Sequence, residues 1–340
     1  MPKQLIILVH GMGTHNKGEI IKEFKKAIGD RAKSFGKHDL EFLKDVDYRE
    51  FNYSEYFDLI RKQFAENAQA RKKGFIYLTG KGFEEKLLNQ LTSFESNFGK
   101  DEFFYTHWLD VILYSTMYFG EKVRIDFISS FEKLRKKYDH KNIHIICHSL
   151  GTAVVHDALA KYYREESDPF DEIPDLKTGN FNIASAWTVA NVSRMVNMLN
   201  GLKDPYHSTF VTGSDGCMSD FVNIRHKYDP FTWFMTYGRQ MDNSATFVNS
   251  EIRKVNTHDF YEYMTEPNVA RAILNYIYEI DVSDDDFMQG QNEYMEGVVT
   301  QEVKDLVDLL DEVISDPSID SLKDAIQQFK SIQKLIKDLS

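Results

Sequence analysis

The segment 143–153 reads IHIICHSLGTA and joins two kinds of local pattern. Residues 143–147 form a β-rich, mostly apolar run, which is typical of a strand buried on both faces of a parallel sheet. After Ser149, apolar residues recur at helical spacing, at Val154, Val155, Ala158 and Leu159. We therefore expect a buried strand that turns sharply into a helix, with Ser149 at the tip of the turn.

Small residues flank this serine on both sides. Cys147 stands two positions before Ser149 and Gly151 two positions after it, as expected where a strand and a helix approach closely around a strained turn. Backbone N–H groups at the start of the helix are placed to stabilise an oxyanion. The segment resembles the G-x-S-x-G nucleophile elbow of the α/β-hydrolase superfamily, with Cys147 in place of the first glycine. The simpler alternative is that Ser149 only caps a helix.

The rest of the chain alternates short β-rich runs with longer helical patterns. This alternation predicts an α/β fold with a doubly wound, mostly parallel sheet, and the resemblance implies the α/β-hydrolase fold. The expected strands are residues 5–10, 46–53, 143–147, 182–189, 220–225 and 246–255. The expected helices between them are residues 19–33, 149–165 and 259–279.

The connection over residues 54–140 is longer than one crossover helix needs. Helical patterns at 55–71, 83–98, 108–119 and 122–138 predict a helical insertion, which is a lid candidate. Residues 103–114 are unusually aromatic for an insertion. Two interpretations stay open for them, a lining for an acyl pocket or ordinary hydrophobic core.

A second motif follows the first expected strand. Residues 5–15 read LIILVHGMGTH, a buried strand that ends in a turn with glycines at positions 11 and 13. Strand followed by His-Gly resembles the oxyanion loop of lipase-like hydrolases, which implies that the N–H groups of Met12 and Leu150 form an oxyanion hole. Gly11 and Gly13 permit the tight turn and close approach that this needs. A dinucleotide-binding turn fits poorly because Asn16 stands where a third glycine is required, and an ordinary loop is the other alternative.

The resemblance also implies an acid and a base after the nucleophile, in the chain order Ser, Asp, His. Asp229 follows the expected strand 220–225, and His258 lies between the last expected strand and the last helix. Ligand sites in open α/β sheets lie at these strand ends. We therefore predict a triad of Ser149, Asp229 and His258, although Asp229 before a proline is also a common turn.

These features together imply a serine hydrolase that cleaves carboxylic esters, including lipid esters, through an acyl-enzyme. A thioesterase or peptidase would use the same triad, and a catalytically silent interaction module would keep the fold alone. No cofactor and no metal site are expected. There is no His-Glu-x-x-His motif, and His144 and His148 straddle a strand-turn junction rather than one helical face.

Composition narrows the class of protein further. The 340 residues carry 41 Lys+Arg and 53 Asp+Glu, a net charge of −12, so no nucleic-acid partner is expected. Two cysteines, Cys147 and Cys217, give no sign of pairing and fit a reducing compartment. No signal segment and no apolar run of 18 residues occur, so we expect a cytoplasmic protein without a transmembrane segment.

The negative charge is concentrated at the end of the chain. Residues 281–340 hold 15 acidic and 5 basic side chains, so they carry −10 and leave −2 for residues 1–280. We expect a hydrolase domain over 1–280, an acidic linker over 281–286 and a helical hairpin over 299–339. The apolar faces of this hairpin either pack on the domain or bind a second copy or another protein.

Overall fold

The computed structural model describes residues 3–66, 110, 111, 113–115, 117–163, 182–199, 207–233, 236–254 and 256–296. The helix expected at 83–98, most of the aromatic segment 103–114 and the hairpin expected at 299–339 lie outside these residues. Within the described part, no helix is long and apolar enough to cross a membrane.

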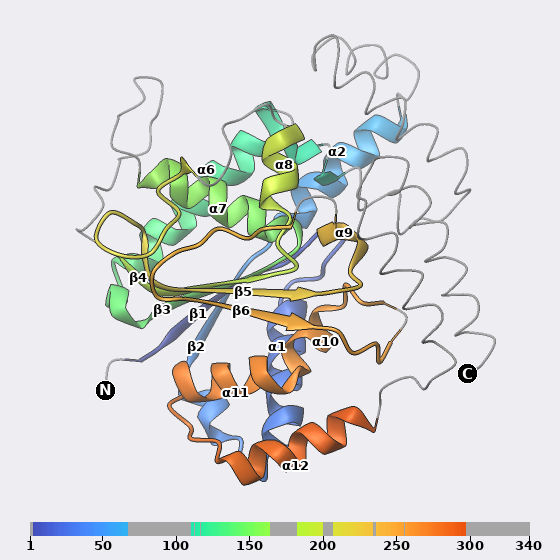
Figure 1. Cartoon of the computed structure of the whole chain (residues 1–340). Helices are drawn as coiled ribbons and strands as arrows, with labels where there is room; N and C mark the ends of the chain where they lie inside the picture. Colours follow the sequence, from blue (N-terminus) through green and yellow to red (C-terminus); the bar gives the residue numbers. More distant parts are fainter. Residues whose placement is uncertain are drawn as a thin grey trace, which may run out of the picture.

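A single open sheet of six parallel strands forms the centre of the protein (Figure 1). Its order is β2-β1-β3-β4-β5-β6. The strands are β1 (Leu5–Val9), β2 (Asp47–Phe51), β3 (Ile143–His148), β4 (Ile183–Val189), β5 (Met218–His226) and β6 (Ser244–Asn249). Strands β1, β3 and β4 are buried at every position, as expected for the centre of an α/β fold.

Each expected strand is present, but the last one is shorter than predicted. Strand β6 ends at Asn249 rather than at residue 255. The Asn249 side chain accepts a hydrogen bond from the Glu251 N–H at 2.9 Å, and this local turn competes with continued strand pairing.

Helices cover both faces of the sheet (Figure 1). One face carries α1 (Glu19–Ser34), α10 (Phe260–Thr265), α11 (Pro267–Tyr276) and α12 (Asp284–Met295). The other carries α6 (Met117–Arg135), α7 (Leu150–Tyr162) and α8 (Ser193–Leu199). Further described helices include α2 (Ser54–Glu66), α9 (Pro230–Trp233) and the short 3-10 helices η1 (Glu41–Lys44) and η2 (His140–Asn142).

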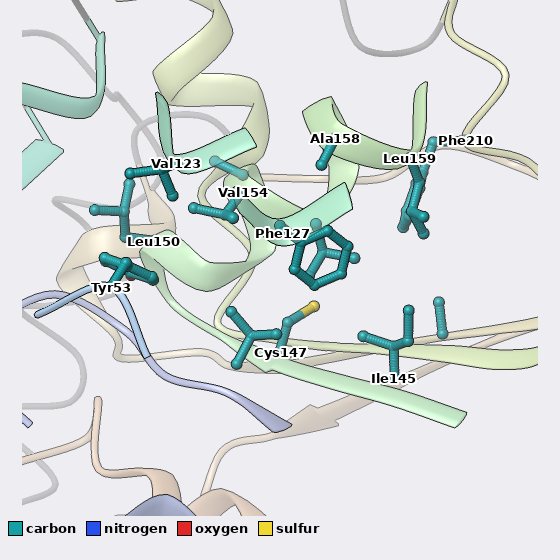
Figure 2. Packing of buried hydrophobic residues seen from close by; sticks show 14 of the residues in the cluster. Tyr53, Val123, Phe127, Ile145, Cys147, Leu150, Val154, Ala158, Leu159 and Phe210 are labelled. Carbon is teal, nitrogen blue, oxygen red and sulfur yellow. The ribbon is translucent and has the colours of Figure 1, made fainter. Parts of the chain in front are cut away.

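The hydrophobic core lies in two layers, one on each side of the sheet. In the layer under α7, Cys147 and Leu150 pack with Phe127 of α6 (Figure 2). The described part of the aromatic insertion joins this layer, because Val111 and Tyr114 are fully buried in it. These residues of the insertion are therefore core. The strand and helix that flank Ser149 are thus held by packing from both insertion and sheet.

The helix predicted over 259–279 is two helices. Helix α10 ends at Thr265, and α11 begins at Pro267. Proline has no N–H to continue the first helix, whereas it suits the first position of a new one. The Glu266 carboxylate accepts a hydrogen bond from the Val269 N–H at 2.8 Å and caps α11.

The prediction of a solvated linker directly after residue 280 was wrong in part. Ser283 caps α12, and the acidic residues 284–286 form its first turn, where negative charge is favourable. This helix docks on α1: the Arg31 guanidinium donates to the Gly290 carbonyl at 2.9 Å, and Tyr294 is buried. The folded body therefore extends to at least residue 296.

Candidate active site

The site lies where the direction of the chain connections reverses. Strand β1 has β2 on one side and β3 on the other, so the loops that follow β1 and β3 meet at a switch point. Val9 at the end of β1 is paired in register with Cys147 of β3. The loop 10–13 therefore lies beside Ser149 at the carboxyl edge of the sheet.

Ser149 occupies a strained conformation at the turn between β3 and α7. Its φ of 53° and ψ of −124° fall in a region that costs a non-glycine residue about 1–3 kcal/mol. Hydrogen bonds hold it there: the Ser149 N–H donates to the Val189 carbonyl at 2.9 Å, and the Thr152 hydroxyl donates to the Ser149 carbonyl at 2.6 Å. Strain held by surrounding structure is typical of functional turns.

The glycines near Ser149 are required by close contacts. A Cβ at Gly151 would lie 2.4 Å from the His10 carbonyl oxygen, and a Cβ at Gly11 would lie 2.8 Å from the Ser149 Cβ. Gly13 has a φ of 93°, which favours glycine. Cys147 is free and fully buried, and burial raises the pKa of its thiol, so it stays protonated.

Ser149, His258 and Asp229 form one chain of hydrogen bonds. The Ser149 Oγ lies 2.8 Å from His258 Nε2, and His258 Nδ1 lies 2.6 Å from Asp229 Oδ2. All three are buried, with Ser149 1% and Asp229 0% exposed. Because a carboxylate only accepts, Nδ1 carries a proton and Nε2 is the acceptor for the serine hydroxyl when the imidazole is neutral.

Further groups orient the acid and the base. The Phe231 N–H donates to Asp229 Oδ1 at 3.0 Å, and the Tyr263 hydroxyl donates to Asp229 Oδ2 at 2.7 Å. His148 Nε2 donates to the His258 carbonyl at 3.0 Å. The Phe231 ring centre lies 4.4 Å from that of His258. Both the carboxylate and the imidazole are thus fixed by more than one contact.

His10 supports the loop that contains Met12. Its Nδ1 donates to the Gly11 carbonyl at 2.7 Å, and its Nε2 accepts from the Tyr53 N–H at 3.1 Å. Burial lowers the pKa of His10 to about 3, so the ring is neutral. The Gly13 N–H donates to the buried Asp110 carboxylate at 2.7 Å.

Among the described residues, the loop 10–13 and the start of α7 each contain an N–H group for which no backbone acceptor is found. Leu150 is the first residue of α7, so its N–H has no partner within the helix. Among the described residues, no acceptor is found for the N–H of Met12 or of Leu150. These are the N–H groups that the sequence resemblance assigned to an oxyanion hole.

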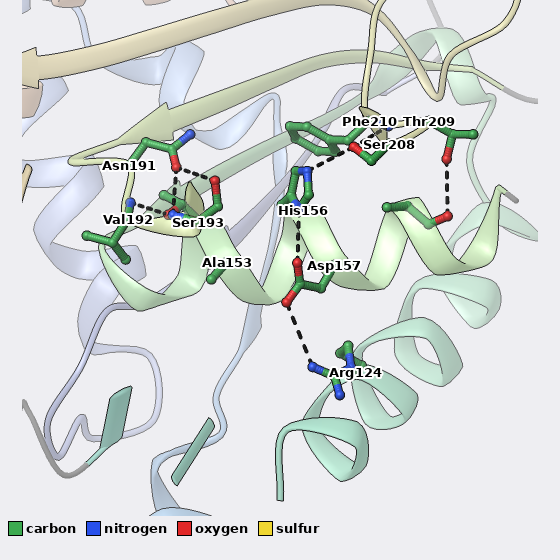
Figure 3. Close-up of polar contacts among 12 residues, drawn as sticks. Arg124, Ala153, His156, Asp157, Asn191, Val192, Ser193, Ser208, Thr209 and Phe210 are labelled. Atoms are coloured by element: carbon green, nitrogen blue, oxygen red, sulfur yellow. Dashed lines mark hydrogen bonds and ion pairs between the residues drawn. The ribbon is translucent and has the colours of Figure 1, made fainter. Parts of the chain in front are cut away.

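A second Ser-His-Asp contact occurs between α7 and the segment 208–210 (Figure 3). His156 Nε2 lies 2.9 Å from Ser208 Oγ, and its Nδ1 lies 2.9 Å from Asp157 Oδ1. The Ser208 oxygen also accepts from the Phe210 N–H and from Arg239, and no helix begins after it. Among the described residues, Ser208 therefore differs from Ser149 in that no helix begins directly after it.

The structure joins the predicted Ser149, Asp229 and His258 by hydrogen bonds and places Gly11 and Gly151 in close contact around the serine turn. Cys147 and Leu150 flank this turn, and Met12 and Gly13 lie on the loop after β1. The structure also adds residues that had not been predicted. The roles of Asp110 and Tyr263 depend on contacts between distant segments, so no local motif marks them. The Thr152 hydroxyl lies only three residues after Ser149, but its bond to the Ser149 carbonyl was not predicted. In the sequence, His148 was considered only together with His144, as an unsuitable metal-binding pair. Its position directly before the serine could have indicated a supporting role.

Among the described residues, no group of three or more His, Cys, Asp or Glu side chains could hold a metal ion. The chain matches no protein-family model and no curated protein.

Proposed function

We propose that this protein is a serine hydrolase with an α/β-hydrolase fold that cleaves carboxylic esters. The observation that carries the proposal is the hydrogen-bonded chain from Ser149 through His258 to Asp229. Its nucleophile stands on a strained turn at a helix N-terminus, next to two available N–H groups. Nucleophile, base and orienting carboxylate in this relation are the minimum that acyl transfer needs.

The topology supports the same proposal. Ser149 follows β3, Asp229 follows β5 and His258 follows β6, so each side chain comes after the carboxyl end of a different parallel strand. This distribution is typical of sites in open α/β sheets. The chain order Ser, Asp, His is the order used by α/β hydrolases.

In the proposed reaction, His258 Nε2 takes the Ser149 hydroxyl proton while Oγ attacks the ester carbonyl carbon. The carbonyl oxygen becomes an oxyanion that accepts hydrogen bonds from the Met12 and Leu150 N–H groups. The imidazolium is stabilised by Asp229 and then protonates the departing alcohol. This leaves the acyl group on Ser149.

A second half-reaction completes the cycle, with water as the nucleophile and Ser149 as the leaving group. His258 removes a proton from water, the hydroxide attacks the acyl carbon, and the proton returns to Ser149 Oγ as the acid leaves. A small ester and a lipid ester both fit this chemistry. Thioesters and peptides are the alternative substrates, and a silent interaction module is the alternative without turnover.

Hydrolysis of p-nitrophenyl esters of increasing acyl length tests the proposal. We expect the wild type and Ser208→Ala to be equally active, and Ser149→Ala to lose at least about 10³-fold in kcat. The Ser208→Ala variant is a matched control because it also removes a hydroxyl bonded to a histidine. Equal activity in wild type and Ser149→Ala would refute the proposal, and activity on amide or thioester analogues alone would redirect it.

A further inference from the structure

The Asp229 carboxylate accepts more hydrogen bonds than orientation of His258 alone requires. Its Oδ2 receives both His258 Nδ1 at 2.6 Å and the Tyr263 hydroxyl at 2.7 Å. Tyr263 is 2% exposed and is anchored in turn, because its oxygen accepts the His226 N–H at 3.1 Å. Three segments are therefore joined at one phenol oxygen: the end of β5, the loop after it and α10.

We propose that Tyr263 is a positioning residue that moderates the attraction of Asp229 for the proton on His258. This inference rests on the proposed function of the triad. Two donors on one carboxylate oxygen share its negative charge, so the bond to Tyr263 weakens the stabilisation that Asp229 gives to the imidazolium. It also prevents the carboxylate from rotating away from His258.

The phenol is a permanent donor in this position. Burial and the neighbouring Asp229 carboxylate raise the pKa of Tyr263 well above its usual range, so the hydroxyl keeps its proton through the range in which an ester hydrolase works. A carboxylate cannot donate, and the His226 N–H occupies the acceptor side of the phenol oxygen. The direction of the hydrogen bond from Tyr263 to Asp229 is therefore fixed.

Other titratable groups surround Tyr263, Asp229 and His258. His148 of β3 has its ring centre 4.8 Å from that of His258. On β5, His226 lies next to Tyr263, and burial lowers the pKa of His226, while Arg225 interacts with the phenol by charge. Glu262 on α10 binds Lys254 at 2.8 Å. None of these groups is removed by a change of the Tyr263 hydroxyl, so they are common to all variants below.

The helix offers a matched control two residues away. The Tyr261 hydroxyl also donates to a carboxylate, that of Asp30 at 2.8 Å, but this carboxylate belongs to α1 and not to the triad. Tyr261→Phe and Tyr263→Phe therefore remove the same kind of bond from the same helix. Only the second removes it from Asp229.

The test measures two midpoints in the full chain. One is the midpoint of His258 protonation, followed by NMR of labelled imidazoles. The other is the midpoint of the acidic limb of kcat/KM on p-nitrophenyl acetate. Without the phenol donor, Asp229 stabilises the imidazolium more strongly. In Tyr263→Phe we therefore expect both midpoints to rise by about 0.5 pH unit, with kcat about 3- to 10-fold lower. In Tyr261→Phe both midpoints should equal those of the wild type.

A second variant tests the direction of the shift in the His258 midpoint and keeps the packing of the Tyr263 ring. Incorporation of 3-fluorotyrosine at position 263 keeps the ring and strengthens the donor, so the midpoint should move down rather than up. A lower kcat with unchanged midpoints in both position-263 variants would overturn the proposal and leave Tyr263 a structural residue. If the wild type shows no Ser149-dependent turnover, the proposed function fails, while the NMR midpoints still decide the role of Tyr263.

Discussion

Gly11→Ala is the substitution whose effect follows most directly from the packing of the site. The added Cβ would lie 2.8 Å from the Ser149 Cβ and 3.1 Å from His148 Nδ1. Ordinary contact begins at about 3.4 Å, so the loop or the serine must move by roughly 0.6 Å. Neither can yield easily, because Ser149 is held by Val189 and the loop by His10 and its partners.

A shift of this size acts on catalysis more than on folding. A displacement of about 1 Å between reacting groups costs on the order of 10²-fold in rate, and loss of one oxyanion donor costs a similar factor. We expect kcat on p-nitrophenyl acetate to fall by about 10- to 100-fold. Overpacking should also lower the free energy of unfolding by about 1–3 kcal/mol.

Gly29→Ala is the matched control for this substitution. Gly29 lies inside α1, and its added Cβ would meet two flexible side-chain ends, Leu40 Cδ1 at 3.3 Å and Leu43 Cδ1 at 3.6 Å. We expect unchanged kcat and a free energy of unfolding that is equal or up to about 1 kcal/mol higher, because alanine favours helix. Wild-type kcat and stability in Gly11→Ala would refute the close packing of the loop against Ser149.

Three further predictions concern the acid, the fold and its pH dependence. Asp229→Asn should lower kcat by about 10³- to 10⁴-fold without unfolding the protein, because an amide favours the wrong His258 tautomer. Steady-state kinetics measures the loss in kcat, and circular dichroism checks the fold. A loss in kcat under tenfold would contradict this prediction. Gly290→Ala should lower Tm by several degrees at unchanged kcat, since its Cβ would lie 2.4 Å from the Phe35 ring; an unchanged Tm would show that α12 does not dock on α1. Burial lowers the pKa of His144 to about 4, so the stability that its neutral form contributes is present above pH 6.5 and is lost as the pH falls towards 4. Between pH 7 and 4, the free energy of unfolding measured with urea should therefore fall less in His144→Gln than in the wild type, by up to about 1.4 kcal/mol per pH unit. Equal falls in the free energy of unfolding would argue against a buried neutral ring.

Much of the fold could be predicted because its determinants are local. Buried parallel strands are continuous apolar runs, and glycines mark the turn at residues 11 and 13 and the start of α7 at residue 151. The resemblance to a hydrolase site, with Asp229 and His258 placed after expected strands, predicted that both meet Ser149, since parallel strands end at one edge.

The remaining features depend on contacts that a linear pattern does not contain. Tyr263 donates a hydrogen bond to Asp229 because the fold packs α10 against β5. The Asp110 carboxylate, in the insertion, accepts a hydrogen bond from the Gly13 N–H, 97 residues away in sequence. The docking of α12 was missed for another reason. Its three aspartates have the composition of a solvated linker, but after Ser283 they form a favourable first helical turn.

The position of a covalent adduct tests the proposed chemistry most directly. The wild type, Ser149→Ala and Ser208→Ala would be treated with a fluorophosphonate probe, digested and mapped by mass spectrometry. Because Ser149 Oγ lies 2.8 Å from His258 Nε2 at the start of α7, we expect one adduct on Ser149 in the wild type and in Ser208→Ala, and none in Ser149→Ala. No adduct on Ser149 in the folded wild type, or an adduct on Ser208 instead, would contradict the proposed nucleophile.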